Sequence, residues 1–347
     1  MYKAISKFLL LLITILISCN SITKSKEKIT VRNAHAMAYS EKENYVLLFG
    51  GADEKAVLNE TWLLKDTLWE KLAGIDAPPA RTFGSMVYDD ADNRFILFGG
   101  NTVLFGGDTL GNRFLLDDTW EFRNGQWTAI TTTHKPGKRA EAAIAYDKER
   151  KKVILFGGYQ FSEDGNSYIK LNDTWEFDGK DWTMVAATGP SPRNGAAMVY
   201  DAAKKITVLY GGNMLRTQKD SANFNGVSWV WNGQEWTHNP INLPLIFNAA
   251  IAYNADDNSA LLFGGYKNGE RLNDTWSLTD TAKQYVTTLA PPARNHAVMV
   301  YNSKAKAMVL FGGHDGENVF GDMWQFADNK WVLINNTSSL KRTDNKH

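Results

Sequence analysis

Arginine and carboxylate side chains recur at fixed places along this 347-residue chain, and they are the residues best suited to do chemistry. A guanidinium group binds a carboxylate through two parallel hydrogen bonds, and that carboxylate can belong to a ligand or to the protein itself. Five arginines open repeats of the chain, and each acid stands two residues before a tryptophan. The arginines are Arg32, Arg81, Arg139, Arg193 and Arg294, and the acids are Glu60, Asp118, Asp173, Asp274 and Asp322.

The spacing of these residues favours a structural pairing. Four of the acids precede the arginine of the following repeat by twenty or twenty-one residues. In the fifth repeat Phe247 takes the place of the arginine and Val227 replaces the preceding acid, so the two positions change together. Such an arginine can still offer spare donors to an anion. The expected bidentate pairs between neighbouring repeats are Glu60 with Arg81, Asp118 with Arg139, Asp173 with Arg193, Asp274 with Arg294 and, on closure, Asp322 with Arg32.

The elements that must position these side chains are six copies of one unit. Each unit has a tyrosine, a diglycine eleven residues later, and a tryptophan that opens the next apolar segment. Twelve Trp, thirteen Tyr and twenty-eight Gly with nine Pro are typical of short aromatic strands joined by tight turns. The third repeat shows the four expected strands, at about 143–146, 153–156, 174–177 and 182–185. The diglycines are Gly50-Gly51, Gly99-Gly100, Gly157-Gly158, Gly211-Gly212, Gly264-Gly265 and Gly312-Gly313.

These repeats resemble the kelch family, whose marks are the diglycine and a spaced aromatic pair in a unit of roughly fifty residues. The resemblance covers residues 31–334 and implies an all-β, six-bladed propeller of four-stranded antiparallel blades around a central channel. It also implies that the repeated arginines near the channel mouth can grip acidic ligands. Both end repeats are complete, so the sequence shows no obvious strand exchange, and how the ring closes stays open at this point. The second tryptophans are expected to pack between sheets, and they are Trp69, Trp127, Trp182, Trp236 and Trp331.

Long connections on one face indicate where a ligand could bind. The connection between the second and third strands spans eleven positions in three repeats, but seventeen or twenty in repeats two, three and four. Insertions on one face of a repeat scaffold are often its binding surface, although such loops can also simply cover strand edges. A protein or glycan partner fits the aromatic and polar residues there. The candidates are Phe105, Arg113, Phe114, Tyr159, Phe161, Tyr168, Arg216, Lys219 and Phe224.

The N-terminus predicts export and lipid anchoring. Residues 1–18 combine lysines with a short apolar run and no acid, as in a secretory signal. The segment 16–19 resembles a bacterial lipobox, in which Cys19, the only cysteine, would be lipidated. We expect a polar tether at 19–30 and a polar tail at 335–347. Asn20 is compatible with the outer membrane by resemblance to bacterial sorting rules, while a cleaved signal or a single membrane anchor is the alternative. The neutral charge makes nucleic acid an unfavoured partner.

The sequence supports binding more than catalysis. Galactose oxidase shares the architecture but needs a cysteine crosslinked to tyrosine beside copper, and lipidated Cys19 could not supply it. The enzymatic alternative is a sugar-acid (sialate-type) epimerase or lyase, which would need an arginine beside an acid-base residue. No residue is assigned a catalytic role. His35, His296 and His314 with Asp315 could hold a metal, but their spacing matches no ligand motif, so we expect no metal or cofactor.

Overall fold

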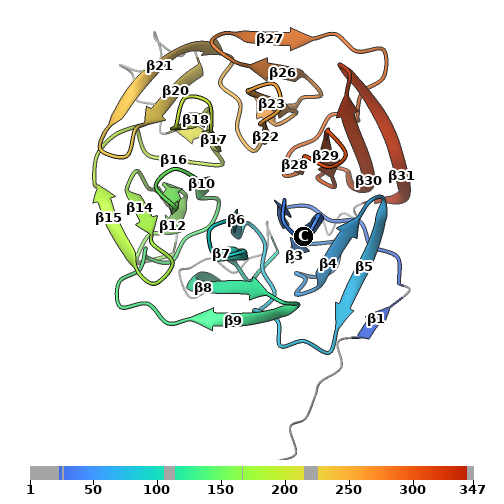
Figure 1. Cartoon of the computed structure of the whole chain (residues 1–347), viewed down its shortest axis with the longest axis horizontal. Helices are drawn as coiled ribbons and strands as arrows, with labels where there is room; N and C mark the ends of the chain where they lie inside the picture. Colours follow the sequence, from blue (N-terminus) through green and yellow to red (C-terminus); the bar gives the residue numbers. More distant parts are fainter. Residues whose placement is uncertain (1–22, 26, 105–113, 166, 215–225, 342–347) are drawn as a thin grey trace, which may run out of the picture.

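The chain forms six antiparallel β-sheets arranged as blades around one axis (Figure 1). The computed structural model describes residues 23–25, 27–104, 114–165, 167–214 and 226–341. The all-β, six-bladed prediction is confirmed. In this part of the chain, no helix has the length and apolar character that a membrane span requires.

Each blade is a meander whose strands are ordered from the axis outward. The short strands are rich in Val, Ile, Leu and aromatic residues, which fit a pleated and buried surface. Blade 1 contains β2 (Ala36–Ser40), β3 (Tyr45–Phe49), β4 (Thr61–Lys65) and β5 (Leu68–Ala73); blade 2 contains β6 (Ser85–Asp89), β7 (Arg94–Asn101), β8 (Leu115–Arg123) and β9 (Gln126–Ile130); blade 3 contains β10 (Ala143–Asp147), β11 (Lys152–Phe156), β14 (Thr174–Phe177) and β15 (Trp182–Ala186).

The second half of the propeller repeats this plan with longer outer strands in blade 6. Blade 4 contains β17 (Ala197–Asp201), β18 (Ile206–Tyr210), β20 (Gly226–Trp231) and β21 (Trp236–Leu243); blade 5 contains β22 (Ala250–Asn254), β23 (Ser259–Phe263), β26 (Thr275–Leu278) and β27 (Ala282–Tyr285); blade 6 contains β28 (Val298–Asn302), β29 (Ala307–Phe311), β30 (Asn318–Ala327) and β31 (Lys330–Lys341). Strand β31 therefore continues beyond residue 334, where the sequence analysis placed the end of the propeller.

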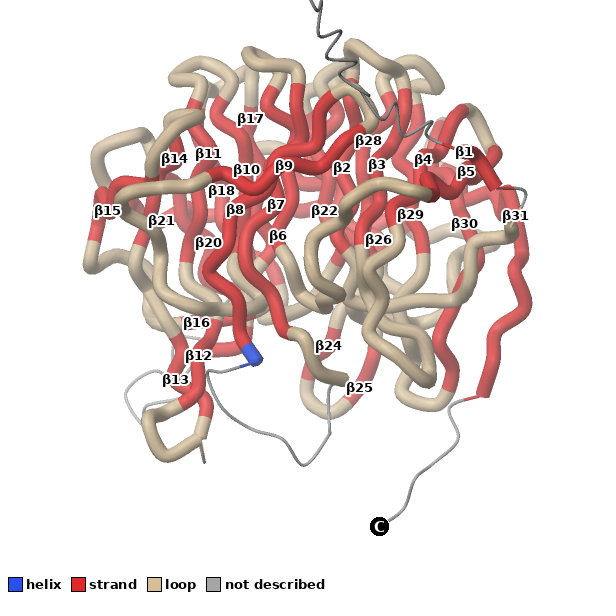
Figure 2. Tube along the Cα trace, turned by 90° about the horizontal axis from the view of Figure 1, so that it is seen from below, coloured by secondary structure: helices blue, strands red, loops and turns tan. Residues whose placement is uncertain are grey.

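Additional short strands decorate the blades. Strand β1 (Thr23–Ser25) pairs with β5 and becomes a fifth strand of blade 1. Three small two-stranded sheets lie at one end of the propeller, and two of them are hairpins in the connection between the second and third strands of a blade; Figure 2 shows these hairpins, β12–β13 and β24–β25, projecting from that face. The three sheets are formed by β12 (Tyr159–Phe161) with β13 (Tyr168–Lys170), β16 (Arg193–Asn194) with β19 (Asn213–Met214), and β24 (Tyr266–Lys267) with β25 (Glu270–Arg271). We call this end the long-loop face.

The apolar core is divided into clusters at the blade junctions. Each of the six junctions has one, including the junction of blades 6 and 1, where Ile29 and Met37 pack with Val309, Phe311 and Met323. The second tryptophans lie in or against these clusters, as expected from the sequence. Four of them donate across a junction to a threonine of the preceding blade, at 2.8–2.9 Å: Trp127 to Thr61, Trp182 to Thr119, Trp236 to Thr174 and Trp331 to Thr275.

The diglycines allow neighbouring blades to approach each other closely. Gly50 and Gly51 both have positive φ, and a Cβ atom on Gly50 would lie 2.6 Å from the carbonyl oxygen of Arg81. The amide of Gly51 donates to that same carbonyl at 2.9 Å. Only glycine combines this backbone conformation with so short an approach.

The ring closes without strand exchange. The four strands of blade 1 and those of blade 6 come from continuous segments of the chain, as expected. Backbone hydrogen bonds join the two blades, from Arg32 to Phe320 at 3.0 Å and from Gly313 to Arg32 at 2.9 Å. The last junction therefore uses the same contacts as the others.

Candidate functional site at the channel mouth

Four of the five repeated arginines form ion pairs, three of them bidentate, but with different partners from those predicted. Arg81 binds Asp118 at 2.7 and 2.8 Å, and Arg294 binds Asp322 at 2.6 and 2.8 Å. Arg139 binds Asp173 in the same way, and Arg32 donates to Glu60 at 2.8 Å. Each of these four arginines thus pairs with the acid of its own repeat. The predicted pairing with the acid of the preceding repeat is wrong.

The geometry of a blade explains the correction. The arginine precedes the innermost strand, and its Nη1 donates to the first diglycine carbonyl 18 residues later, at the end of the second strand. The acid opens the third strand beside that glycine, as the bond from Gly50 N to Glu60 O shows. The arginine backbone still contacts the preceding blade, because Gly51 donates to Arg81 O. The residue therefore joins two blades, with its side chain in one and its main chain in the other.

Blades 4 and 5 depart from this pattern. In blade 5 the position of the arginine is held by Ile246, because Gly212 donates to Ile246 O as Gly51 does to Arg81 O. The assignment of Phe247 to this position was wrong by one residue. Asp274 instead accepts from Gln284 at 2.9 Å. Arg193 donates to the carbonyls of Gly211 and Ser191, at 2.8 and 3.0 Å.

We call the six positions Arg32, Arg81, Arg139, Arg193, Ile246 and Arg294 the staple ring. The paired arginine side chains are only 0–3 % exposed. Burial alone would raise the pKa of Glu60, but hydrogen bonds from Lys71, Arg32 and Trp62 outweigh burial and lower that pKa to about 2. The opening tryptophans also bind these acids, as Trp120 binds Asp118 at 2.7 Å. These four arginines are committed to the protein itself and do not present their charge at the channel mouth.

A second ring lies two residues after the staple ring in each repeat. Its six residues all have a left-handed backbone, with φ between 53° and 61°, which is uncommon outside glycine. Each backbone amide donates to the carbonyl of the ring residue in the preceding blade, at 2.8–3.3 Å. Ala34 donates to His296, so the six hydrogen bonds form a closed circle around the axis. We call this the mouth ring, and it consists of Ala34, Phe83, Glu141, Gly195, Asn248 and His296.

Side chains of the mouth ring meet across the channel. Glu141 belongs to blade 3 and His296 to blade 6, on opposite sides of the ring, yet Glu141 Oε1 lies 3.8 Å from His296 Nε2. Phe83 packs edge-on against the His296 ring, with centroids 5.0 Å apart. The Nδ1 atom of His296 also lies 3.0 Å from Nε2 of His314. These contacts close the channel at the long-loop face.

Glu141 is a buried carboxyl group without an arginine partner. Its side chain is 6 % exposed and accepts a hydrogen bond from Asn194 Nδ2. Burial raises its pKa to about 7, while Asn194, Lys170 and Asn248 act in the opposite direction. Burial, together with the charges of His314 and Arg271, holds the pKa of His296 well below its ordinary value of 6.5. A carboxyl group that titrates near neutral pH beside a neutral imidazole could transfer protons.

Several buried polar atoms at the mouth have no hydrogen-bond partner among the described residues. They are His296 Nε2, Asn295 Oδ1 and Arg271 Nε. Lys170 approaches the same region from β13 and donates to Asn213 Oδ1 at 3.0 Å. Because buried polar groups are normally satisfied, such a group of open donors and acceptors indicates a place where a ligand could complete the bonding.

Comparison with known proteins agrees with the geometry. The KLHDC2/KLHL20/DRC7 kelch-repeats domain matches residues 9–183 and 172–347. The chain belongs to the kelch-repeat family. This kelch chain is 26 % identical over 198 residues to an F-box/kelch-repeat protein of Arabidopsis thaliana, which covers 51 % of the chain and 40 % of the relative.

Two further relatives are much longer proteins. The flagellar outer-arm dynein alpha chain of Chlamydomonas reinhardtii is 26 % identical over 53 % of this kelch chain and 4 % of its own length. A leucine-zipper-like transcriptional regulator 1 homolog of Drosophila melanogaster is 30 % identical over 46 % of the chain and 17 % of its own length. The kelch chain therefore spans less than half of each of these three relatives.

The aromatic candidates on the long-loop face of this kelch propeller differ in exposure. Tyr159 and Phe161 are 3 % and 2 % exposed and pack with Phe83 and Leu115, whereas Tyr168 is 47 % exposed. Phe114 is partly buried. Tyr168 is thus the aromatic side chain of β12–β13 best placed to touch a partner. The candidates Phe105, Arg113, Arg216, Lys219 and Phe224, and the lipidation candidate Cys19, lie outside the described residues.

The histidine cluster of the kelch propeller is only partly assembled. His296 and His314 stack against each other, whereas His35 packs edge-on against Phe311. Burial lowers the pKa of His35 to about 3. Within the described ranges, no group of three or more His, Cys, Asp or Glu side chains could hold a metal ion.

The sequence analysis missed most residues of the mouth. It named His296 and His314 but not Glu141, Asn248 or Arg271. The sequence does contain one indication of the mouth ring. The residue two positions after each staple-ring residue is different in every repeat.

Proposed function

We propose that this kelch propeller is a ligand-binding module of the bacterial envelope, held at the membrane by a lipid on Cys19. Its ligand is a protein or glycan that binds on the long-loop face, over the mouth ring. Kelch propellers are typically protein-binding modules, which supports the general assignment. The names of the relatives describe those proteins and do not identify a partner here.

One observation carries the choice of the mouth. Open donors and acceptors on Arg271, Asn295 and His296 lie beside a carboxyl group that titrates near neutral pH. Leaving buried polar groups unpaired costs about 1–3 kcal/mol each, so a ligand that pairs with them gains that stabilisation. The exposed side chains of Tyr168 and Ile169 on β13 would add apolar contact beside this polar centre.

Thermal-shift measurements on the full chain test this proposal. The panel contains sugar acids, neutral oligosaccharides and a soluble extract of envelope proteins. A ligand at a hundred times its Kd adds about 2.7 kcal/mol of stability. We expect Arg271→Met and His296→Leu to abolish the shift, and Val332→Ser on the outer edge of blade 6 to retain it. A shift that survives both mouth substitutions would place the ligand elsewhere.

A second candidate is a sugar-acid epimerase or lyase, favoured by the contact of Glu141 with His296. An acid-base pair of this kind could remove and return a proton next to a carboxylate bound by Arg271. Incubation with sialate-type sugar acids in deuterated water is the direct test. Incorporation of deuterium that disappears in Glu141→Gln supports the enzyme. Binding without incorporation or product leaves the binding module as the function.

The anchoring proposal rests on the lipobox at 16–19. We expect Cys19→Ala to release the protein from the outer-membrane fraction into the soluble fraction, and Cys19→Ser to behave in the same way. Metabolic labelling with a fatty-acid analogue should mark the wild-type chain alone. Unchanged membrane association of both variants would contradict lipid anchoring.

A further inference from the structure

One row of paired residues fills the blade junctions. It crosses the second, third and fourth strands of a blade and faces the preceding blade. In blade 2 the row is Phe95, Phe122 and Trp127, and neighbouring rings have centroids 6.2 and 5.1 Å apart. In five of the six blades the row ends in the second tryptophan: Trp69, Trp127, Trp182, Trp236 and Trp331.

The row of blade 5 lacks all of its aromatic rings. It consists of Ala260, Leu278 and Ala282, which face blade 4. The hairpin is also shorter, because residues 279–281 separate Leu278 from Ala282, whereas residues 123–126 separate Phe122 from Trp127. The junction of blades 4 and 5 is therefore the one that receives no second tryptophan.

The residues that would contact this tryptophan differ as well. In the first junction Trp127 packs against Phe49 of the preceding blade, with centroids 5.1 Å apart. Blade 4 has Tyr210 at the position of Phe49, opposite the first residue of the innermost strand. Where other blades have the threonine that accepts the indole N–H, blade 4 has Ser228, whose hydroxyl donates to the carbonyl of Asn239 at 3.3 Å. The partners of the missing indole thus changed with it.

A crevice of about 290 Å³ lies at the junction of blades 4 and 5. Blade 4 contributes Val208 and Tyr210 to its walls, and blade 5 contributes Ala260 and Leu278. Ile241, on the long strand β21, packs into the same apolar cluster and lines the crevice. Space that holds an indole in the other junctions is only partly filled here.

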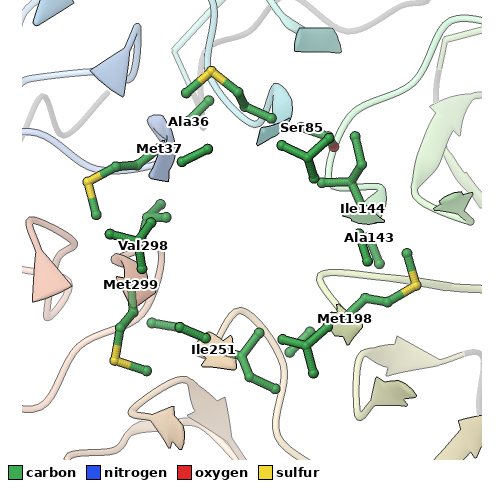
Figure 3. A pocket seen from close by; sticks show the side chains of 18 of the residues that line it. Ala36, Met37, Ser85, Ala143, Ile144, Met198, Ile251, Val298 and Met299 are labelled. Carbon is green, nitrogen blue, oxygen red and sulfur yellow. The ribbon is translucent and has the colours of Figure 1, made fainter. Parts of the chain in front are cut away.

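The crevice opens on the face opposite the mouth. Its charged rim comes from the β17–β18 and β26–β27 turns, where Lys204 lies 2.8 Å from Asp280 and 3.6 Å from Asp201. Of the described residues, it shares only Val199 and Tyr253 with the lining of the central channel, whose open centre Figure 3 shows. None of the described residues that line it belongs to the mouth ring, so this site is distinct from the mouth.

We propose that this crevice binds one uncharged, planar aromatic ring system of about the size of indole, from a free small molecule. The other five junctions indicate the occupant, because each encloses an indole in the equivalent place. An engineered cavity of about 150 Å³ binds benzene, so the crevice has room for a bicyclic ring. Tyr210 offers an aromatic surface, and such pairs add to the effect of apolar burial. Because the Ser228 hydroxyl is directed to β21, apolar shape selects the ring.

The rim favours a free ring over one carried by a polypeptide. The ion pair between Lys204 and Asp280 joins a turn of blade 4 to a turn of blade 5 at the opening of the crevice. A ring attached to a peptide backbone would have to displace this pair. The proposal does not depend on the function assigned to the mouth.

Calorimetric titration of the full chain with indole is the first test. We expect one saturable site per chain. N-acetyl-tryptophanamide carries the same ring on a peptide-like group and should bind at least ten-fold more weakly. Equal affinities would overturn the assignment to a free small molecule, and absence of saturable indole binding would overturn the site itself.

Two variants fill the crevice with rings that blade 2 has in its own row. Ala260→Phe and Leu278→Phe place phenyl groups at the positions of Phe95 and Phe122. We expect each to weaken indole binding at least ten-fold while keeping wild-type circular dichroism. Val332→Phe, on the 52 % exposed outer edge of blade 6, adds the same ring elsewhere and should bind indole normally. Undiminished binding in both filling variants would overturn the proposal.

Methyl NMR locates the ring in the wild-type protein and does not rely on the folding of a variant. We expect nuclear Overhauser effects from bound indole to the methyl groups of Val208, Ile241 and Leu278. Contacts with Ile144, in the channel wall, in place of these three would overturn the proposal. His296→Leu, which tests the mouth, should leave indole affinity unchanged within two-fold. The crevice can therefore be confirmed or rejected whatever the outcome at the mouth.

Discussion

The staple ring and the mouth ring lie two residues apart in each repeat and handle buried charge in opposite ways. In the staple ring, Glu60 is bound by Arg32 and Lys71, and its pKa falls to about 2. In the mouth ring, Glu141 lies beside amides and a neutral imidazole, and its pKa rises to about 7. The carboxylate of the staple ring therefore stays ionised at neutral pH, whereas the carboxyl group of the mouth ring titrates near neutral pH.

The difference also appears in how the repeats vary. Five of six staple-ring positions are arginine, and four of these bind the acid of their own blade. The mouth ring has six different residues on one shared backbone conformation. In a repeat protein, a side chain that recurs is explained by what every blade needs. A position that keeps its backbone and changes its side chain indicates a role belonging to the whole ring.

The largest expected effect comes from breaking one staple. Arg294→Met should lower the free energy of unfolding by about 3–5 kcal/mol, because it leaves Asp322 buried without its cation. Urea denaturation of the full chain measures this change.

The double variant Arg294→Met with Asp322→Leu is the control for that staple. It should recover most of the loss, because a buried ion pair is often replaceable by apolar residues of similar volume. Ligand binding at the mouth should be unaffected in the double variant. A loss below about 1 kcal/mol in the single variant would mean that the staple is not a stabilising element.

The next effect concerns the mouth ring and depends on pH. The pKa of Glu141 in the fold lies above its ordinary value of 4.5, so the native state holds a proton that the unfolded chain releases. The contribution of this proton to the free energy of unfolding is then fully present below about pH 4.5. It is lost as the pH rises to about 7, and the loss is up to about 3 kcal/mol. We expect Glu141→Gln to remove this decline, as measured by urea denaturation between pH 4.5 and 8.

The groups that face Glu141 define the control for the pH experiment. They are Asn194, Asn248, Lys170 and His296, and the pKa of His296 is lowered, so His296 stays neutral over this range. Glu60→Gln should leave the decline between pH 4.5 and 8 in place, because the pKa of Glu60 is lowered to about 2 and that group titrates only in acid. An identical pH profile for wild type and Glu141→Gln would contradict a raised pKa at the mouth.

The smallest effect comes from a repeated contact outside both rings. Thr119→Val removes the acceptor of the 2.9 Å bond from Trp182, a side chain with 0 % exposure. An unpaired indole N–H should lower stability by about 1–2 kcal/mol. Thermal unfolding measures it, and Trp69, whose indole nitrogen has no partner among the described residues, provides the natural comparison. If Thr119→Val changed ligand binding at the mouth, the assignment of repeated positions to stability and variable positions to binding would be wrong.

The parts of the fold that could be predicted from the sequence are those that every blade shares. The diglycines, tyrosines and tryptophans recur at fixed spacing, so blade number, strand order and complete end blades followed from them. The pairing of Asp118 with Arg139 failed for a physical reason. The separation of Asp118 and Arg139 is constant because only the third and fourth strands of a blade lie between such residues. The true partner of Asp118 is Arg81, and a loop of variable length separates these two residues in the sequence.

The contacts of the mouth could not be predicted, because its ring position is fixed but the side chain there differs in every repeat. Glu141, Asn194, Asn248 and His296 come from four blades and are brought together only when the ring closes. Ile246 could have been placed from the sequence, because it lies seven residues before Tyr253, as the arginines lie before their tyrosines. The loop lengths do place the variable connections at the same end of the propeller as the mouth ring.

The closed circle of hydrogen bonds in the mouth ring has a consequence for how the protein is made. Ala34 emerges from the ribosome long before His296, whose carbonyl it must find. Until blade 6 is synthesised, blade 1 presents an open flank and Glu141 has no imidazole across from it. A nascent chain is therefore without a closed mouth ring until blade 6 is made, and a truncated product lacking blade 6 would carry the arginine staples of its first three blades but no closed ring.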